Sequence, residues 1–181
     1  MPASPSPSFL VHAAALRRVP GTTRLEQRRG VIEDLGTVSV AVPEGAEVDA
    51  EVTLSSYPGG ITATGTVSAP WQGECRRCGG VVTGEVQASV RERYVPADAG
   101  IVPVDPEADV YLMTDDLLDL EPLARDAVLL ELPLAPLCSD DCLGLCPVCG
   151  ANRNLETCAC APPADPRWSA LDALREVEGG G

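Results

Sequence analysis

Eight cysteines are the residues of this chain best suited to chemistry, and six of them lie close together. These six fall between Leu137 and Cys160 with the spacing C-x3-C-x3-C-x2-C-x8-C-x-C. They include the turn C-P-V-C-G, and the other two cysteines form the similar segment C-R-R-C-G at 75–79. A C-x-x-C-G turn can bring two thiolates to one metal ion, because glycine permits the sharp turn after the second cysteine. The spacing therefore predicts metal ligation.

Eight thiolates divide without remainder into two tetrahedral zinc sites. The predicted ligands are Cys75, Cys78, Cys138, Cys142, Cys146, Cys149, Cys158 and Cys160. The partition with the shorter loops joins the last four cysteines and leaves the first four for the second ion. A zinc-ribbon partition would instead join the two C-x-x-C turns. In both cases we expect one or two structural zinc ions, which would order residues 137–164, a segment without apolar periodicity.

Other uses of the cysteines stay open at this point. No stretch approaches the roughly 18–20 apolar residues of a membrane span. In a secretion signal the positive residues precede the apolar segment, whereas here Arg17-Arg18 follow the apolar residues 9–16. We therefore expect a cytoplasmic protein, in which disulfides are disfavoured. A thiol redox role for Cys75 and Cys78 and an iron–sulfur cluster remain alternatives.

Catalysis finds little support in the sequence. His12 is the single histidine, and an all-cysteine zinc site leaves no position for an activated water. The neighbouring carboxylates Asp115, Asp116 and Asp119 precede a predicted helix, where acidic residues are expected for capping and for the helix dipole. We expect no enzyme.

The apolar pattern predicts an α+β fold, with an antiparallel and partly barrel-like β-sheet followed by helices. Period-two alternation over 48–55 and 61–67, separated by Pro58-Gly59-Gly60, predicts a hairpin. A third strand is expected at 71–75, a fourth at 82–90 and a short one at 110–113, with the first C-x-x-C turn at a hairpin tip. A helix is predicted at 120–132 with Asp119 as its N-cap. Outside these elements we expect a disordered 1–8, a loop at 95–109 and a last helix at 165–178, within one domain spanning 9–178.

Charge is distributed unevenly along the chain. The net charge is −14, yet residues 1–30 hold five arginines and one glutamate, so the other residues together carry −18. An acidic body repels nucleic acid and attracts basic proteins. The arginine-rich start is predicted to be a loop or arm, either a solvated surface segment or a binding arm.

Several segments together resemble the YceD family of large ribosomal RNA subunit accumulation proteins. They are R-R-V-P-G-T at 17–22, G-E-C-R-R-C at 73–78, the run D-D-L-L-D-L-E-P-L-A-R-D-A-V-L-L-E-L-P-L-A-P-L-C at 115–138, C-L-G-L-C-P-V-C-G at 142–150 and D-P-R-W-S-A-L at 165–171. The resemblance implies a small bacterial protein that supports synthesis, processing or stability of large-subunit ribosomal RNA. It also implies a gene beside that of a small basic ribosomal protein.

Two modes of action are compatible with that role. In one, an acidic face binds a basic large-subunit ribosomal protein; its candidate residues are Asp105, Glu107, Asp109, Asp115, Asp116 and Asp119. In the other, arginines contact precursor ribosomal RNA; the candidates are Arg17, Arg18, Arg24, Arg28, Arg29, Arg76 and Arg77. A zinc-stabilised interaction module of another assembly, such as one acting in transcription, is the alternative reading.

Overall fold

The computed structural model describes residues 7–97, 110–161 and 167 of the chain. The chain divides into two compact units. The first, here called the sheet unit, comprises Met1–Glu74 and Val81–Pro136; the second, the cysteine unit, comprises Cys75–Gly80 and Leu137–Gly181. The predicted helix at 165–178 and most of the predicted loop at 95–109 lie outside the described residues.

Strands dominate the sheet unit, which confirms an α+β fold with much sheet and little helix. A short 3-10 helix at Pro7–Phe9 precedes the other elements, which are β1 Leu10–His12, α1 Ala14–Arg18, β2 Thr23–Val31, β3 Val40–Ala41, β4 Glu47–Tyr57, β5 Gly60–Glu74, β6 Val81–Pro96, β7 Tyr111–Met113, β8 Leu117–Asp119 and α2 Glu121–Glu131. Within the described ranges, no helix is long and apolar enough to cross a membrane.

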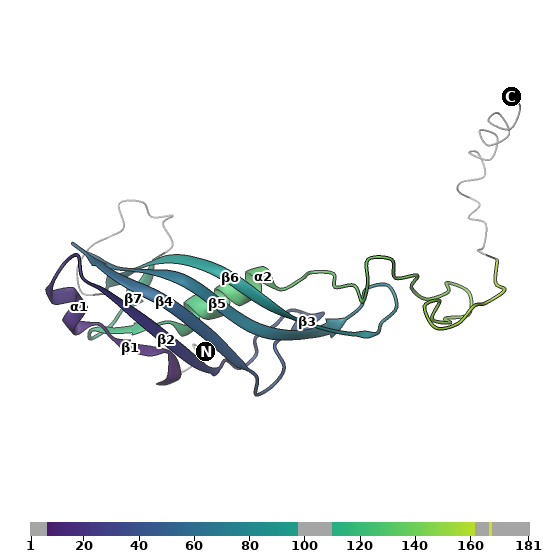
Figure 1. The fold of residues 1–181 in the computed structure, drawn as a ribbon, viewed down its shortest axis with the longest axis horizontal. Coiled ribbons are helices and arrows are strands. Elements are labelled where there is room, and N and C mark those ends of the chain that lie inside the picture. The colour runs from purple at the N-terminus through teal and green to yellow at the C-terminus, as the bar shows by residue number, and fades with distance from the viewer. Residues whose placement is uncertain (1–6, 98–109, 162–166, 168–181) are drawn as a thin grey trace, which may run out of the picture. The chain divides into compact units, whose positions relative to one another are not determined.

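The main sheet is antiparallel except at one edge, where two strands run parallel. Its strand order is β2-β4-β5-β6-β7, with β3 paired to β5, and only β6 and β7 run parallel (Figure 1). A separate pair joins β1 to β8. Among the described strands the path begins at β2 and ends at β7 without closing on itself, so a partly barrel-like sheet is not confirmed.

The predicted hairpin is confirmed, and its buried face follows the period-two pattern. Val48, Val52 and Leu54 of β4 are fully buried, and the turn at Pro58-Gly59 leads into β5. The predicted third strand is not separate, because β5 continues without a break to Glu74. Strand β5 includes Pro70, although proline usually interrupts a strand. Pairing with β4 ends at Ser68, and a strand tolerates proline where one side lacks a partner.

The arginine-rich segment is a strand for most of its length, so the expected loop or arm is wrong. Residues 23–31 form β2, which pairs with β4 along its whole length. The alternation in β2 involves charged residues, with Arg24, Glu26 and Arg28 on one side and Leu25 and Gln27 on the other. A pattern search that looks for apolar residues misses such a strand.

Helix α2 lies one residue inside each predicted end. Its N-cap is Leu120 instead of Asp119, but Asp119 still acts there, since its Oδ1 accepts a hydrogen bond of 2.9 Å from the Glu121 N–H. Asp115 and Asp116 do not lead directly into the helix. Both have positive φ, 51° and 60°, and form the tight turn between β7 and β8.

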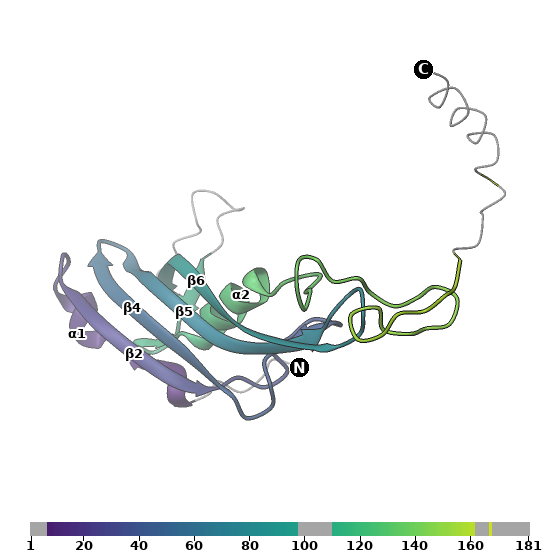
Figure 2. The same ribbon diagram turned by 45° about the vertical axis from the view of Figure 1, so that its right-hand side comes forward.

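One face of the sheet is covered and the other is open. Helix α2 packs on β5 and β6, and α1 on β4 and β5 (Figures 1 and 2). The core between them is built from aliphatic side chains with Phe9, Tyr94 and Met113 as its large members. Consequently the outer residues of β4, β5 and β6 face solvent.

Candidate metal centres

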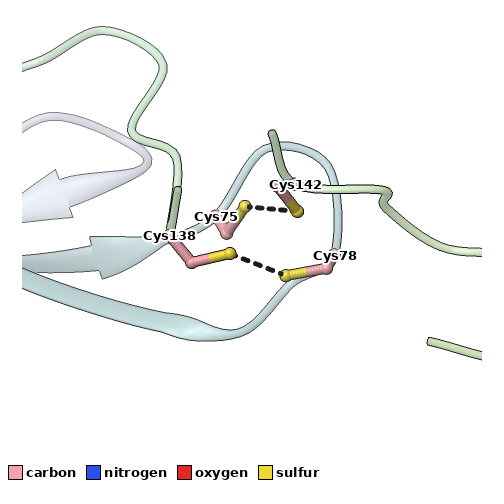
Figure 3. Close-up of side chains that lie close together, drawn as sticks. All are labelled: Cys75, Cys78, Cys138 and Cys142. Carbon is pink, nitrogen blue, oxygen red and sulfur yellow. Dashed lines mark hydrogen bonds between the residues drawn. The ribbon is translucent and has the colours of Figure 1, made fainter. Parts of the chain in front are cut away.

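The eight cysteine sulfurs gather into two groups of four in the cysteine unit. The first centre comprises Cys75, Cys78, Cys138 and Cys142, and the second comprises Cys146, Cys149, Cys158 and Cys160. Within each group all four Sγ atoms lie within 4.8 Å of one another, and Figure 3 shows the first. The geometry therefore follows the partition with the shorter loops, and the zinc-ribbon partition is not formed.

The first centre is built on the hairpin tip between β5 and β6. The Gly79 N–H donates to the Cys75 carbonyl at 2.8 Å, and the Cys75 N–H donates to the Gly80 carbonyl at 2.7 Å. Gly79 has a φ of +70°, which explains why glycine follows the second cysteine. This tight turn points two sulfurs toward Cys138 and Cys142, which arrive from the other segment of the unit (Figure 3).

The second centre repeats the same turn farther along the chain. The Gly150 N–H donates to the Cys146 carbonyl at 2.9 Å, and Gly150 has a φ of +75°. The Cys146 N–H donates to the Ala151 carbonyl at 2.8 Å. All four ligands of this centre lie within a short stretch, so its assembly needs little loop closure.

The sulfur distances fit a single tetrahedral ion. Cys75 and Cys142 are 3.8 Å apart at Sγ, and Cys78 and Cys138 are 3.7 Å apart. A zinc–sulfur bond of about 2.3 Å in a tetrahedron requires sulfurs about 3.8 Å apart. A disulfide needs about 2.05 Å. A multinuclear iron–sulfur cluster places iron and sulfide between its thiolates and would need wider separations. Both groups could hold a metal ion.

The electrostatics of the thiols also suit a cation. Backbone hydrogen bonds, chiefly from Cys138 to Cys75 and from Cys149 to Cys146, lower the pKa of Cys75 and Cys146 to about 6. Neighbouring sulfurs have the opposite effect: Cys142 raises the pKa of Cys138 to about 12. The backbone therefore stabilises the thiolates of Cys75 and Cys146, and hydrogen bonds from Asn154 and the Gly144 backbone outweigh burial and lower the pKa of Cys142. The remaining thiolates need compensating positive charge, which a bound metal would supply.

Arg77 holds the first centre together through its guanidinium and its backbone. Its Nη1 donates to the carbonyls of Asp140 and Cys142, both at 3.0 Å, and its own carbonyl accepts from the Leu145 N–H at 3.1 Å. Gly144 approaches the same carbonyl so closely that a Cβ would lie 3.0 Å from it. Arg77, a candidate for RNA contact, is thus engaged in the metal-binding loop.

Asn154 is a residue that the sequence reading missed. Its Nδ2 donates to the Cys142 sulfur at 3.3 Å, and its Oδ1 accepts from the Leu143 N–H at 2.8 Å. The Asn152 side chain in turn accepts from the Asn154 N–H at 3.0 Å. Hydrogen bonds to ligating sulfurs orient the ligands and tune the metal. The sequence feature that could have indicated this contact is the segment N-R-N at 152–154, which places two asparagines inside a cysteine-rich loop.

The other candidate arginines are mostly engaged in ion pairs. Arg24 and Arg28 both bind Glu26, at 2.5 and 2.7 Å, and Arg17 binds Asp116. Arg29 binds Asp49. The remaining two, Arg18 and Arg76, are exposed and form no ion pair with another described residue.

The candidate acidic residues are only partly described. Asp105, Glu107 and Asp109 lie outside the described residues. Asp115 is exposed beside Asp116 in the β7–β8 turn, and Asp119 caps α2 with a pKa raised by burial. The described part of the set is therefore one short turn and a capping residue.

Two further arginines, Arg91 and Arg93, are not among the candidates from the sequence, because they lie in the middle of a predicted β region and not in an arginine-rich segment. Both are exposed in β6. The signal that could have found them is the alternation Arg91-Glu92-Arg93, which places two like charges on one face of a strand.

The chain is similar in sequence to known proteins over a range that includes both candidate metal centres. Residues 63–175, which include both centres, match the family model described as "Large ribosomal RNA subunit accumulation protein YceD". Uncharacterised proteins of Mycobacterium tuberculosis and Mycobacterium bovis are 39% identical over 137 residues, 76% of this chain and 66% of theirs. One from Mycobacterium leprae is 35% identical over 138 residues, 76% of this chain and 63% of its own. The chain thus spans about two thirds of the length of these relatives. No solved structure matches. Because the family model matches more than half of the chain, the chain belongs to the YceD family.

Proposed function

We propose that this protein is a non-catalytic accessory factor that supports the accumulation of large-subunit ribosomal RNA, through its synthesis, its processing or its stability in subunit assembly. The observation that carries the proposal is the family match over 63–175, a range that includes both cysteine centres and the end of the sheet. Four cysteines around one ion leave no position for a reactive water, which favours a structural role for both centres.

Zinc is the metal we propose for the two centres. Cysteine-only tetrahedral sites are typical of structural zinc, and the sulfur spacing suits a mononuclear ion. The cysteine unit needs such support, since its buried apolar residues in the described ranges are only Cys75, Cys142 and Cys146. Its larger aliphatic side chains, such as Leu143 and Leu155, are exposed. Structural zinc contributes roughly 10–16 kcal/mol of apparent binding energy, enough to order a unit without an apolar core.

The partner would be a basic large-subunit ribosomal protein or precursor large-subunit ribosomal RNA. The net charge of −14 supports attraction to a basic protein. Arginines without an ion pair in the described residues support contact with RNA phosphates. The two modes are compatible with one role in assembly.

Complementation of a depletion strain tests the proposed function. The ratio of large-subunit to small-subunit ribosomal RNA should fall on depletion and recover with the wild-type chain. Affinity purification from the same cells should then yield precursor large-subunit RNA, a basic ribosomal protein or both. An unchanged ratio, or capture of a transcription complex without ribosomal components, would contradict the proposal in favour of an interaction module of another assembly.

A further inference from the structure

The exposed pair Arg91 and Arg93 lies on the open face of the sheet. Successive strand residues point to opposite faces. In β6, Tyr94 and Val90 are buried on the inner face. Arg91 and Arg93 therefore point to the outer face, away from α2, and Glu92 between them points to the inner one.

The strand register extends each arginine into a row of hydroxyl groups. Arg93 pairs with Thr62, which pairs with Ser55. Arg91 pairs with Thr64, which pairs with Thr53. A third row pairs Ser89 with Thr66. Figures 1 and 2 show β4, β5 and β6 side by side along this region. We call these eight residues the hydroxyl–arginine face.

Most arginines of the sheet unit outside this face are engaged by a partner, with Arg18 as an exposed exception. Arg17, Arg24, Arg28 and Arg29 are all in ion pairs, and Arg125 bonds Glu121 and two carbonyls. Arg91 and Arg93 form no ion pair with a described residue, and their own two rows contain no carboxylate, whereas the third row continues from Thr66 to Glu51 of β4. The nearest acid on the same face of β4 is Glu51, which accepts a hydrogen bond of 2.5 Å from Gln27. Two cations without an ion pair thus stand beside two rows of neutral, hydrogen-bonding side chains.

We propose that the hydroxyl–arginine face binds the phosphodiester backbone of RNA, an inference that rests on the proposed function and deepens it. Guanidinium groups bind phosphate oxygens in a bidentate manner, and Ser and Thr hydroxyls are common phosphate and sugar contacts. The eight residues include no aromatic side chain for base stacking. Binding at this face is therefore sequence-independent, and it weakens as salt rises.

The test compares the full-length, metal-loaded wild type with R91Q/R93Q. Fluorescence anisotropy would measure binding to a labelled single-stranded RNA of mixed sequence and to the same sequence as a duplex, over a range of salt. R91Q/R93Q should bind about tenfold or more weakly, since hydrogen bonds to charged groups are strong. For single-stranded RNA, its salt slope should fall by roughly 1.4, which is about 0.7 for each lost phosphate contact.

Matched variants separate this role from general effects. Arg153→Gln removes an exposed arginine of the cysteine unit and should leave binding unchanged. R91K/R93K keeps the charge but loses bidentate geometry, so its affinity should lie between those of the wild type and R91Q/R93Q. Circular dichroism, thermal unfolding and metal content should be equal in all variants.

Three outcomes would overturn the inference: no measurable wild-type binding to either RNA at low salt, equal affinity of R91Q/R93Q and the wild type, or loss in R91Q/R93Q of a captured protein partner with RNA binding intact. Complementation distinguishes such a failure from failure of the proposed function. If the wild type restores the ribosomal RNA ratio while R91Q/R93Q binds RNA normally, only the face is wrong. If the wild type does not restore the ratio, the proposed function itself fails.

Discussion

The side-chain amide of Asn154 donates a hydrogen bond to the Cys142 sulfur at 3.3 Å, which links the loop of one candidate metal centre to a ligand of the other. Asn154 lies in the loop between Cys149 and Cys158 of the second centre, and Cys142 is a ligand of the first. The Arg153 N–H strengthens this link, because it donates to the Gly144 carbonyl at 2.9 Å. Ordering the loop of one centre therefore positions a hydrogen-bond donor for the other.

Asn154→Ala should weaken metal binding at the first centre by about 10–100-fold, the usual effect of removing a partner of a metal ligand. The second centre should be little affected, because the lost bond touches none of its sulfurs. Competition between a chromogenic chelator and the cobalt-loaded protein would resolve the two affinities. Arg153→Ala, which removes an exposed side chain from the same turn, is the control and should release both metals as the wild type does. Equal weakening of both centres would contradict the assignment.

Metal content should respond to cysteine substitutions in units of one ion. We expect two ions per chain in the wild type, and one each in C75S/C78S and C158S/C160S, because each double variant removes half of one ligand set. Elemental analysis of protein purified under reducing conditions measures this. Purified wild type with a single ion would contradict the occupation of both groups, and loss of both ions in C158S/C160S would show that the two groups do not bind independently.

Gly144→Ala should destabilise the metal-loaded cysteine unit more than Gly150→Ala. Both glycines have positive φ, 71° and 75°, so alanine costs about 1–2 kcal/mol at either position. A Cβ at Gly144 would also lie 3.0 Å from the Arg77 carbonyl, whereas one at Gly150 meets nothing within 4 Å. The rate of metal release to a chelator at several temperatures would rank the two variants. Equal release rates would indicate that the Arg77 carbonyl moves away from the new Cβ, and the reverse order would contradict the prediction.

The sequence was most informative where spacing or periodicity is set locally. The ligand partition could be ranked because short loops close more easily, and the α2 helix and the β4–β5 hairpin follow from apolar periodicity. The Asn154 contact could not be found this way, since it depends on how two loops fold against each other. Strand β2 was missed because its alternating residues are charged: Arg24 and Arg28 are half-buried and form ion pairs with Glu26. Long-range pairing, not local pattern, decides such positions.

Tyr94→Phe should destabilise the sheet unit by about 0.5–1.5 kcal/mol at neutral pH. Tyr94 is fully buried, stacks on Tyr111 with ring centroids 5.2 Å apart, and donates from its hydroxyl to the Asp119 carbonyl at 3.1 Å. Urea unfolding at pH 8 measures the loss. Tyr57→Phe, on the outer side of β4, is the control and should change stability less.

Alkaline pH should reduce the stability advantage of the wild type over Tyr94→Phe. Burial raises the pKa of Tyr94 in the folded protein, so the folded state keeps a proton that the unfolded chain releases above about pH 10. The contribution of the phenol is therefore complete below about pH 10 and is lost as the pH rises further. Urea midpoints of the two proteins should therefore be separated up to about pH 10 and converge above it, because the ordinary pKa of tyrosine is about 10. A constant difference would mean that Tyr94 ionises in the folded state.

Gly65→Ala should cost about 3 kcal/mol or more, because its Cβ would lie 2.0 Å from the Glu51 carbonyl oxygen and 2.7 Å from the Val52 Cα. Both contacts are with backbone of the neighbouring strand β4, which cannot shift without breaking its pairing. Thermal unfolding followed by circular dichroism would show the loss. Thr83→Ala, at an exposed position of β6, should stay within about 0.5 kcal/mol of the wild type.

The first centre joins sulfurs that are far apart in the chain. Cys78 and Cys138 are 60 residues apart in sequence, and the segment between them contains β6, β7, β8 and α2. A bound ion would close this segment into a ring, as a disulfide does. For a ring of that size, the lost entropy of the unfolded chain corresponds to about 4 kcal/mol. Unlike a disulfide, this cross-link would open when free metal falls, so the supply of the metal would control the stability of the segment that contains β6, β7, β8 and α2.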